Sequence, residues 1–180
     1  MGDFSLYMGG RTPPDFPVRS MGLDISTKTG VVVLRQESES RDSVEVLYHA
    51  EIVAPKKEVA KGNLWRGGYI ADRVREAVDA YLYTPEPYEV VVEGYGYGNR
   101  YTLATLVEIG TLIRYIFVHR DMGFQVVAPS RLKKLITGSG VATKKDMIAA
   151  CAKVGFVTDN NNEADAFCLA WAGLFHRGEL

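Results

Sequence analysis

Three segments in the first third of the sequence are rich in apolar and β-branched residues, and short polar turns separate them. The segments are VRSMGLDI, GVVVLRQ and VEVLYHAEIV, and the turns between them are STKT and ESESRDS. Apolar runs separated by short polar turns are typical of an antiparallel meander. We therefore expect three sequential antiparallel strands before Pro55.

Beyond Pro55 the spacing of apolar residues changes to three and four, which predicts a helix over residues 63–83. The run YEVVVEGY that follows is almost wholly apolar, as in a central strand buried on both faces. A stripe with helical spacing then predicts a helix over 101–121; it consists of Leu103, Leu106, Gly110, Ile113 and Phe117. A fifth strand, FQVVA, and helices over 130–136, 144–154 and 163–177 complete the pattern.

This order predicts an α/β fold with a five-stranded mixed sheet, in which three antiparallel strands precede parallel strands and helices flank the sheet. Residues 1–18 contain three prolines and no apolar run of signal-peptide length, so we expect a flexible N-terminal arm before one domain over 19–180. With 47% hydrophobic and 24% charged residues and no membrane-length apolar run, a soluble cytoplasmic protein with no membrane contact is expected. Cys151 and Cys168 are expected to be buried thiols.

Charge is unevenly distributed, although the formal net charge is only −1. Residues 94–159 contain nine Lys or Arg and four Asp or Glu, a net charge of +5, which leaves −6 for the rest of the chain. A basic half beside an acidic cluster suits a protein that holds a phosphate backbone and binds divalent cations, and it also arises by chance.

Three acidic residues stand where apolar elements end or begin. Asp24 ends the first strand, Glu93 ends VVVEG, and Asp165 lies in the first turn of the last helix. If the first and fourth strands are neighbours, Asp24 and Glu93 lie side by side at one edge of the sheet. Adjacent carboxylates both stay ionised at neutral pH only with a cation between them, and Mg²⁺ prefers such oxygen ligands.

Each acid also has a simpler explanation. Asp24 can cap the following turn, Glu93 can be an ordinary strand-end acid, and Asp165 can be favoured by the helix dipole. Their joint occurrence favours a metal site, and two Mg²⁺ ions per site are suited to phosphodiester hydrolysis.

Four segments resemble those of the RuvC-type Holliday junction resolvases, in the ribonuclease-H-like superfamily. They are MGLDISTKTGVVVL, VVVEGYGYGN, VVAPSRLKKLITGSGVATKKDMI and NNEADAFCLAWA, and they occur in the family's order. The resemblance implies a nuclease domain of ribonuclease-H-like fold whose catalytic and metal-binding residues include Asp24, Glu93 and Asp165. It also implies Mg²⁺- or Mn²⁺-dependent cleavage of four-way DNA junctions by a homodimer. The compact length resembles bacteriophage members, which accept a broader range of branched DNA.

One position departs from the family pattern, which usually has an acid or a histidine three residues before the last aspartate. Asn162 stands there, and its amide oxygen shares a helix face with Asp165 and can still ligate a metal. On this basis Asn162→Asp is expected to be tolerated and to lower the Mg²⁺ requirement. Glu163 points away round the helix and is the weaker ligand candidate.

Residues expected to hold DNA follow the carboxylates. Lys144 opens a helix and is expected to face the scissile phosphate as a catalytic residue. Tyr95 and Tyr97 are expected to stack on bases exposed at a junction; the alternative is that these tyrosines pack on their own domain. Further DNA-binding candidates are Lys28, Arg100, Arg131, Lys133, Lys134 and Lys145.

A junction has approximate two-fold symmetry, so an enzyme that cuts both strands is expected to be a C₂ dimer. Leu112 and Ile116 lie off the apolar stripe of the 101–121 helix, and with Gly110 they form the interface candidate. Two other functions remain open: a non-catalytic relative that binds branched DNA, and an ATP-binding protein of actin-like fold, which DISTKTG also resembles. The length of one domain disfavours the second, because actin-like proteins bind nucleotide between two such domains.

Overall fold

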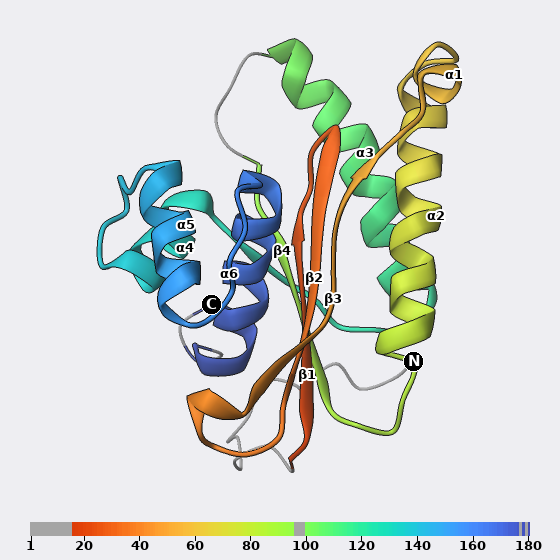
Figure 1. Cartoon of the computed structure of the whole chain (residues 1–180). Helices are drawn as coiled ribbons and strands as arrows, with labels where there is room; N and C mark the ends of the chain where they lie inside the picture. The colour runs from red at the N-terminus through yellow and green to blue at the C-terminus, as the bar shows by residue number, and fades with distance from the viewer. Residues whose placement is uncertain (1–15, 96–99, 177, 179) are drawn as a thin grey trace.

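The structure is a computed structural model that describes residues 16–95, 100–176, 178 and 180, with only the backbone described at 100–102. A twisted sheet lies at the centre, with α2 and α3 on one face and α4, α5 and α6 on the other (Figure 1). The strands are β1 (Val18–Asp24), β2 (Lys28–Gln36), β3 (Val44–Val53), β4 (Tyr88–Glu93) and β5 (Gln125–Val127). The α-helices are α1 (Lys56–Val59), α2 (Asn63–Tyr81), α3 (Arg100–His119), α4 (Pro129–Thr137), α5 (Lys144–Lys153) and α6 (Asn161–Phe175).

The strand order in the sheet is β3-β2-β1-β4-β5. The β1–β2 and β2–β3 pairs are antiparallel, whereas β4 runs parallel to β1 and β5 parallel to β4. This confirms the predicted five-stranded mixed sheet. Because parallel strands end at the same edge, the last residues of β1 and β4, Asp24 and Glu93, come together there.

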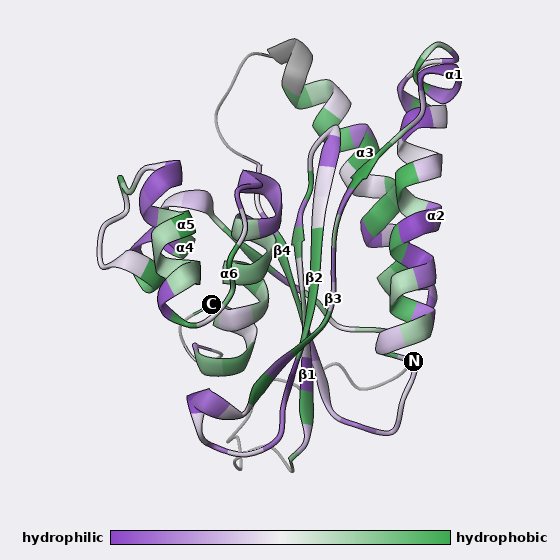
Figure 2. Ribbon diagram, viewed as in Figure 1, coloured by the Kyte–Doolittle hydropathy of each residue, from purple (hydrophilic) through white to green (hydrophobic). Residues whose placement is uncertain are grey.

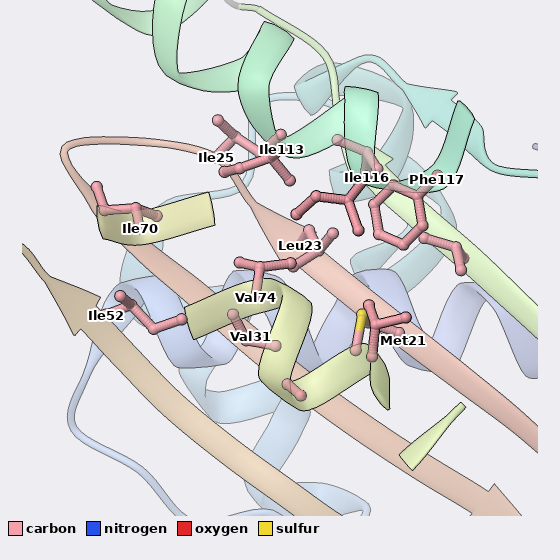
Figure 3. Close-up of a cluster of buried hydrophobic side chains, with 14 of the residues drawn as sticks. Met21, Leu23, Ile25, Val31, Ile52, Ile70, Val74, Ile113, Ile116 and Phe117 are labelled. Carbon is pink, nitrogen blue, oxygen red and sulfur yellow. The ribbon is translucent and has the colours of Figure 1, made fainter. Parts of the chain in front are cut away.

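Alternation along the strands divides the buried side chains between two cores. Met21, Leu23 and Val31 face α2 and α3, where they contact residues such as Ile113 and Phe117 (Figure 3). The intervening positions of β1 and β2 face α6, which is apolar along most of its length and polar in its first turn (Figure 2). Asp24 therefore points to the same side of the sheet as the first turn of α6.

Two glycines let α6 approach the sheet closely. A Cβ atom on Gly22 would lie 1.9 Å from the carbonyl oxygen of Ala166, and one on Gly30 would lie 2.0 Å from that of Asn162. No side chain fits at either position without moving the helix. The contact at Gly30 sets the height of the first turn of α6 above the carboxyl end of β1.

We expect Gly30→Ala to lower the free energy of unfolding by about 2 kcal/mol, because an added methyl group in a filled core forces its neighbours apart. Gly68→Ala is the control, since a Cβ there meets nothing within 4 Å and alanine favours the α2 helix. Urea denaturation of both variants tests this. Equal stability of Gly30→Ala and the wild type would show that α6 does not lie against β2 as described.

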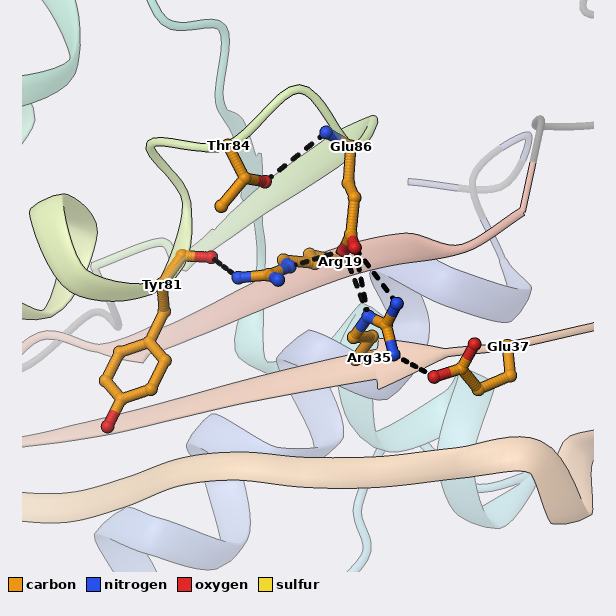
Figure 4. Close-up of polar contacts among 6 residues, drawn as sticks. All are labelled: Arg19, Arg35, Glu37, Tyr81, Thr84 and Glu86. Carbon is orange, nitrogen blue, oxygen red and sulfur yellow. Dashed lines mark hydrogen bonds and ion pairs between the residues drawn. The ribbon is translucent and has the colours of Figure 1, made fainter.

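The opposite end of the sheet is tied by ion pairs around Glu86, in the turn before β4 (Figure 4). Its carboxylate accepts from Arg19 Nε at 2.6 Å and from Arg35 Nη2 at 2.9 Å. Hydrogen bonds from Arg35 and Arg19 lower the pKa of Glu86 to about 2. This cluster joins β1, β2 and the entry to β4, far from the edge that carries Asp24.

The structure corrects the interface predicted on α3. Ile116 is only 8% exposed and belongs to the core between the sheet and α3. Leu112 contacts α2, since its Cδ1 atom lies 2.9 Å from a Cβ placed on Gly67. Ile116 is therefore not available to a partner, and Leu112, which is only partly buried, already packs on α2.

Other predictions need smaller adjustments. Val18, assigned to the arm, is fully buried and begins β1. The helix expected from residue 163 begins at Asn161 because the Asn160 side chain accepts from the backbone N–H groups of Asn162 and Glu163. Cys151 and Cys168 are buried free thiols, as predicted, with their sulfur atoms 3.5 Å apart.

Candidate active site

Asp24 and Glu93 form a buried carboxyl pair at the carboxyl ends of β1 and β4. The register pairs Leu23 with Val92, so the next residues along each strand are neighbours. Asp24 is 6% exposed, and its side chain is hydrogen-bonded to that of Glu93. The sequence prediction that these two acids meet is confirmed.

Burial is the main cause that raises the pKa of Asp24 to about 6. Burial and the adjacent Asp24 charge raise the pKa of Glu93 to about 9. The metal-free pair therefore retains one proton at neutral pH, and Glu93 donates it to the Asp24 carboxylate. A positive charge placed between the two groups would displace this proton.

The turn after Asp24 shows that this aspartate is not needed as a turn cap. Thr29 Oγ1 donates to the Ser26 carbonyl at 2.8 Å and accepts from the Ser26 N–H. Ser26 Oγ donates to the Lys28 carbonyl at 2.9 Å. These bonds close the turn without the Asp24 carboxyl group. The simpler explanation of Asp24 as a capping residue therefore loses its basis.

Asp165 projects from α6 beside the pair, and its negative charge contributes to the raised pKa values of both Asp24 and Glu93. Burial raises the pKa of Asp165 itself, while Lys144 and Lys133 act against that rise. Two positive charges from α5 and α4 thus lie near the carboxyl groups. Lys144 was predicted at the site, but Lys133 was predicted only as a contact to the DNA backbone.

Asn162 and Glu163 point to different partners on β3. Asn162 Nδ2 donates to Glu51 Oε1 at 2.6 Å. Glu163 Oε2 lies 3.0 Å from His49 Nδ1, away from the Asp24–Glu93 pair. This agrees with the weaker ligand role expected of Glu163.

Sequence reasoning missed Glu51. It lies on β3 opposite Gly30, which lies opposite Asp24, and its charge raises the pKa of Asp24. The alternation of VEVLYHAEIV indicated which face of the strand Glu51 lies on, but the register between β2 and β3 was needed to place Glu51 beside the site. The pairing shifts at a bulge between Val33 and Leu34, so counting along the strands would not have given it.

Tyr95 does not have the free ring expected of a stacking residue. Its hydroxyl oxygen lies 2.1 Å from a Cβ placed on Gly110, so the ring fills the space above this glycine. The guanidinium carbon of Arg114 lies 4.6 Å from the ring centroid. The tyrosine packs on its own domain, which is the alternative left open above.

The other DNA-binding candidates vary in placement. Tyr97 and the Arg100 side chain lie outside the described residues. The side chains exposed on the surface are those of Lys28, Arg131, Lys134, Lys144 and Lys145. They remain predictions as DNA contacts.

Among the residues that the structure describes, no three His, Cys, Asp or Glu side chains are grouped as a ready-made metal site. The donor types nevertheless fit a hard divalent cation, because two carboxyl groups share one proton and a third carboxylate and an amide oxygen are carried by α6 above them. The site composed of Asp24, Glu93, Asp165 and Asn162 stays a prediction.

Comparison with known proteins shows which sequences and folds this chain is similar to. No protein-family model matches the chain. A crossover junction endodeoxyribonuclease RuvC from Frankia alni is 29% identical over 116 residues, which cover 61% of this chain and 59% of that protein, less than two thirds of its length.

Solved structures give a more extensive match. The Thermus thermophilus RuvC structure superposes with a TM-score of 0.73 and 18% identity over 89% of this chain and 96% of that one. The T. thermophilus RuvC in complex with Holliday junction substrate gives the same TM-score over 88% and 94% of the two chains. The fold is therefore the RuvC fold, with its ribonuclease-H-like mixed sheet, and part of the chain is similar in sequence to the RuvC endonuclease of Frankia alni.

No helix within the described ranges has both the length and the apolar character needed to cross a bilayer.

Proposed function

We propose that this protein is a divalent-metal-dependent endonuclease that cleaves four-way DNA junctions as a homodimer, in a bacterial or phage-infected cytoplasm. The observation that carries the proposal is the buried Asp24–Glu93 pair at the adjacent ends of β1 and β4, with Asp165 of α6 beside it. The pair occupies the RuvC fold in a chain that resembles a RuvC endonuclease in sequence.

Asp24, Glu93, Asp165 and the Asn162 amide oxygen would hold the metal, for which we propose Mg²⁺ with Mn²⁺ as a substitute and two ions per site. When bound, such ions stabilise the attacking and leaving oxygens of phosphodiester hydrolysis. In the metal-free protein the β1–β4 register places Asp24 and Glu93 side by side, and the proton they share keeps them hydrogen-bonded. The two strands thus hold the ligands in place before any cation arrives.

Positive charge around the pair gives the DNA backbone a place to bind. Lys144 is the first residue of α5, where its ammonium group adds to the positive end of a helix capped by Thr143 and Asp146. Lys133 acts on Glu93 and Asp165 from α4. We propose that Lys144 contacts the scissile phosphate and that Lys28, Arg131, Lys134 and Lys145 contact the neighbouring backbone.

A labelled four-way junction tests the function directly. The purified protein is incubated with the junction, and separately with a linear duplex of the same sequence, in Mg²⁺ or in EDTA. We expect paired, ligatable cuts in the junction only with Mg²⁺, and little cutting of the duplex. Binding without any cut in Mg²⁺ or Mn²⁺ would instead support a non-catalytic relative, and ATP turnover without junction binding would contradict both.

A further inference from the structure

Glu51 brings a fourth carboxyl group to the candidate active site from a strand at the edge of the sheet. Asp24, Gly30 and Glu51 lie opposite one another on β1, β2 and β3. Residues directly opposite on paired strands point to the same face, and each strand spacing is about 4.8 Å. Asp24 and Glu51 thus flank the side-chain-free position of Gly30, beneath the first turn of α6.

Asn162 fills the space above Gly30, between the two strands that carry the acids, and its side chain bonds to Glu51. Its backbone oxygen lies 2.0 Å from a Cβ placed on Gly30, and its Nδ2 atom donates to Glu51 Oε1 at 2.6 Å. An ionised carboxylate only accepts hydrogen bonds, so the amide nitrogen must face Glu51. The amide oxygen, which is the atom able to ligate a cation, is therefore turned away from Glu51.

A second contact between β3 and α6 gives a comparison within the same molecule. His49 Nδ1 and Glu163 Oε2 are 3.0 Å apart, two residues along β3 and one residue along α6 from the first contact. Both contacts join β3 to the first turn of α6. Of the two acids in these contacts, Glu51 raises the pKa of Asp24, as do Asp165 and burial, and so the two contacts differ in what they do to the carboxyl pair.

We propose that Glu51 is a positioning residue of the active site, which fixes the orientation of the Asn162 amide and supplies the negative charge that an acid at position 162 would otherwise provide. The proposal rests on the proposed function in that this site is taken to bind a divalent cation. It also changes one expectation drawn from the sequence. Asn162→Asp would place two carboxylates at hydrogen-bonding distance, so alone it is not tolerated in the metal-free protein.

The test is a cycle of Glu51→Gln, Asn162→Asp and the double variant, with Mn²⁺ alone as the probe. Calorimetric titration gives the Mn²⁺ affinity of the full chain without DNA, and urea denaturation gives its stability. We expect Glu51→Gln to weaken Mn²⁺ binding about tenfold, because it removes a negative charge beside the site and because glutamine, which can donate as well as accept, no longer fixes which way the Asn162 amide faces. Its stability should change little, because glutamine can still bond the amide.

The double variant, Glu51→Gln with Asn162→Asp, is the decisive member. Its new glutamine on β3 and new aspartate on α6 would remake the amide–carboxylate hydrogen bond in reverse, with the charge moved onto the helix. We expect Asn162→Asp alone to destabilise the metal-free protein. The double variant should recover the stability of the wild type, and its Mn²⁺ affinity should return to within about threefold of the wild-type value. Glu163→Gln is the matched control: it alters the His49 contact and should leave Mn²⁺ affinity unchanged.

Three results would overturn the role of Glu51: unchanged Mn²⁺ affinity in Glu51→Gln, no recovery in the double variant, or an equal loss of affinity in Glu163→Gln. Absence of Mn²⁺ binding by the wild type would also overturn it. Junction cleavage is measured separately. If the wild type binds Mn²⁺ and the variants show the expected changes in affinity and stability, but the wild type cuts no junction, only the proposed function is refuted and the role of Glu51 stands.

Discussion

Asp24→Asn is expected to lower Mg²⁺-dependent cleavage of a four-way junction by at least about 10³-fold, corresponding to about 4 kcal/mol of transition-state stabilisation. Asparagine has nearly the same shape and can still hydrogen-bond Glu93, so the fold and the contact between β1 and β4 should be preserved. The charge that would hold a cation is lost. Junction affinity should be equal to or higher than that of the wild type, because one negative charge near the phosphates is removed.

The measurement combines denaturing gels for cleavage with fluorescence anisotropy in EDTA for binding. Asp159→Asn is the matched control, since it removes an exposed aspartate from the loop before α6 and should leave the cleavage rate unchanged. Cutting by Asp24→Asn at the wild-type rate would remove Asp24 from the active site. Loss of both cutting and binding, with an altered circular dichroism spectrum, would show instead that Asp24 is needed for folding.

Glu93→Gln is expected to make the metal-free protein more stable at alkaline pH, by about 2 kcal/mol at pH 8.5. The pKa of Glu93 is raised to about 9 by burial and by Asp24, and that of Asp24 is raised to about 6 by burial. An acid whose pKa is higher in the folded state binds its proton more tightly there. The stabilisation is therefore complete below about pH 4, where the unfolded chain is also protonated, and is lost as the pH rises through 6 and 9.

Glutamine carries no charge at any pH, so the stability of the variant should fall less between pH 5.5 and 8.5. Urea denaturation in EDTA at both pH values measures the difference. Glu89→Gln, at the other end of the same strand, is the control and should not reproduce the alkaline gain. Added Mg²⁺ should stabilise the wild type more than Glu93→Gln, because the cation takes the place of the proton in the wild-type pair. A wild type more stable than Glu93→Gln at pH 8.5 in EDTA would contradict the buried, proton-sharing pair.

Both predictions concern Asp24 and Glu93, a pair of buried acids that lowers the stability of the metal-free protein and on which the proposed function rests. Two acids buried side by side destabilise the metal-free protein, and only a proton or a cation relieves their repulsion. The close packing of α6 through Gly22 and Gly30 keeps a third carboxylate near them. The arrangement is thus closely packed where the cation would bind, and the basic residues that would contact DNA lie mainly on the surface helices α4 and α5.

The sequence by itself determined the order of the elements and the location of the main acids. Alternation in β1 and the apolar run of β4 were local signals, and each ended in an acid, so the pairing of Asp24 with Glu93 followed once the topology was assumed. The predicted helix boundaries differ from those in the structure by at most two residues, because capping and apolar spacing are also local signals. The early start of α6 depended on the Asn160 cap, and the short α1 helix carried no apolar period to reveal it.

Only the tertiary structure decided which side chains face the acids. Glu51 lies beside the site because of the register of β2 with β3. The Tyr95 ring packs against α3 instead, because Gly110 provides a space for it. Ile116 lies off the apolar stripe of α3 yet is buried, because α3 is covered by both α2 and the sheet. Contacts between residues distant in sequence depend on strand register and on the space between packed elements, and neither is encoded in a local pattern of polar and apolar positions.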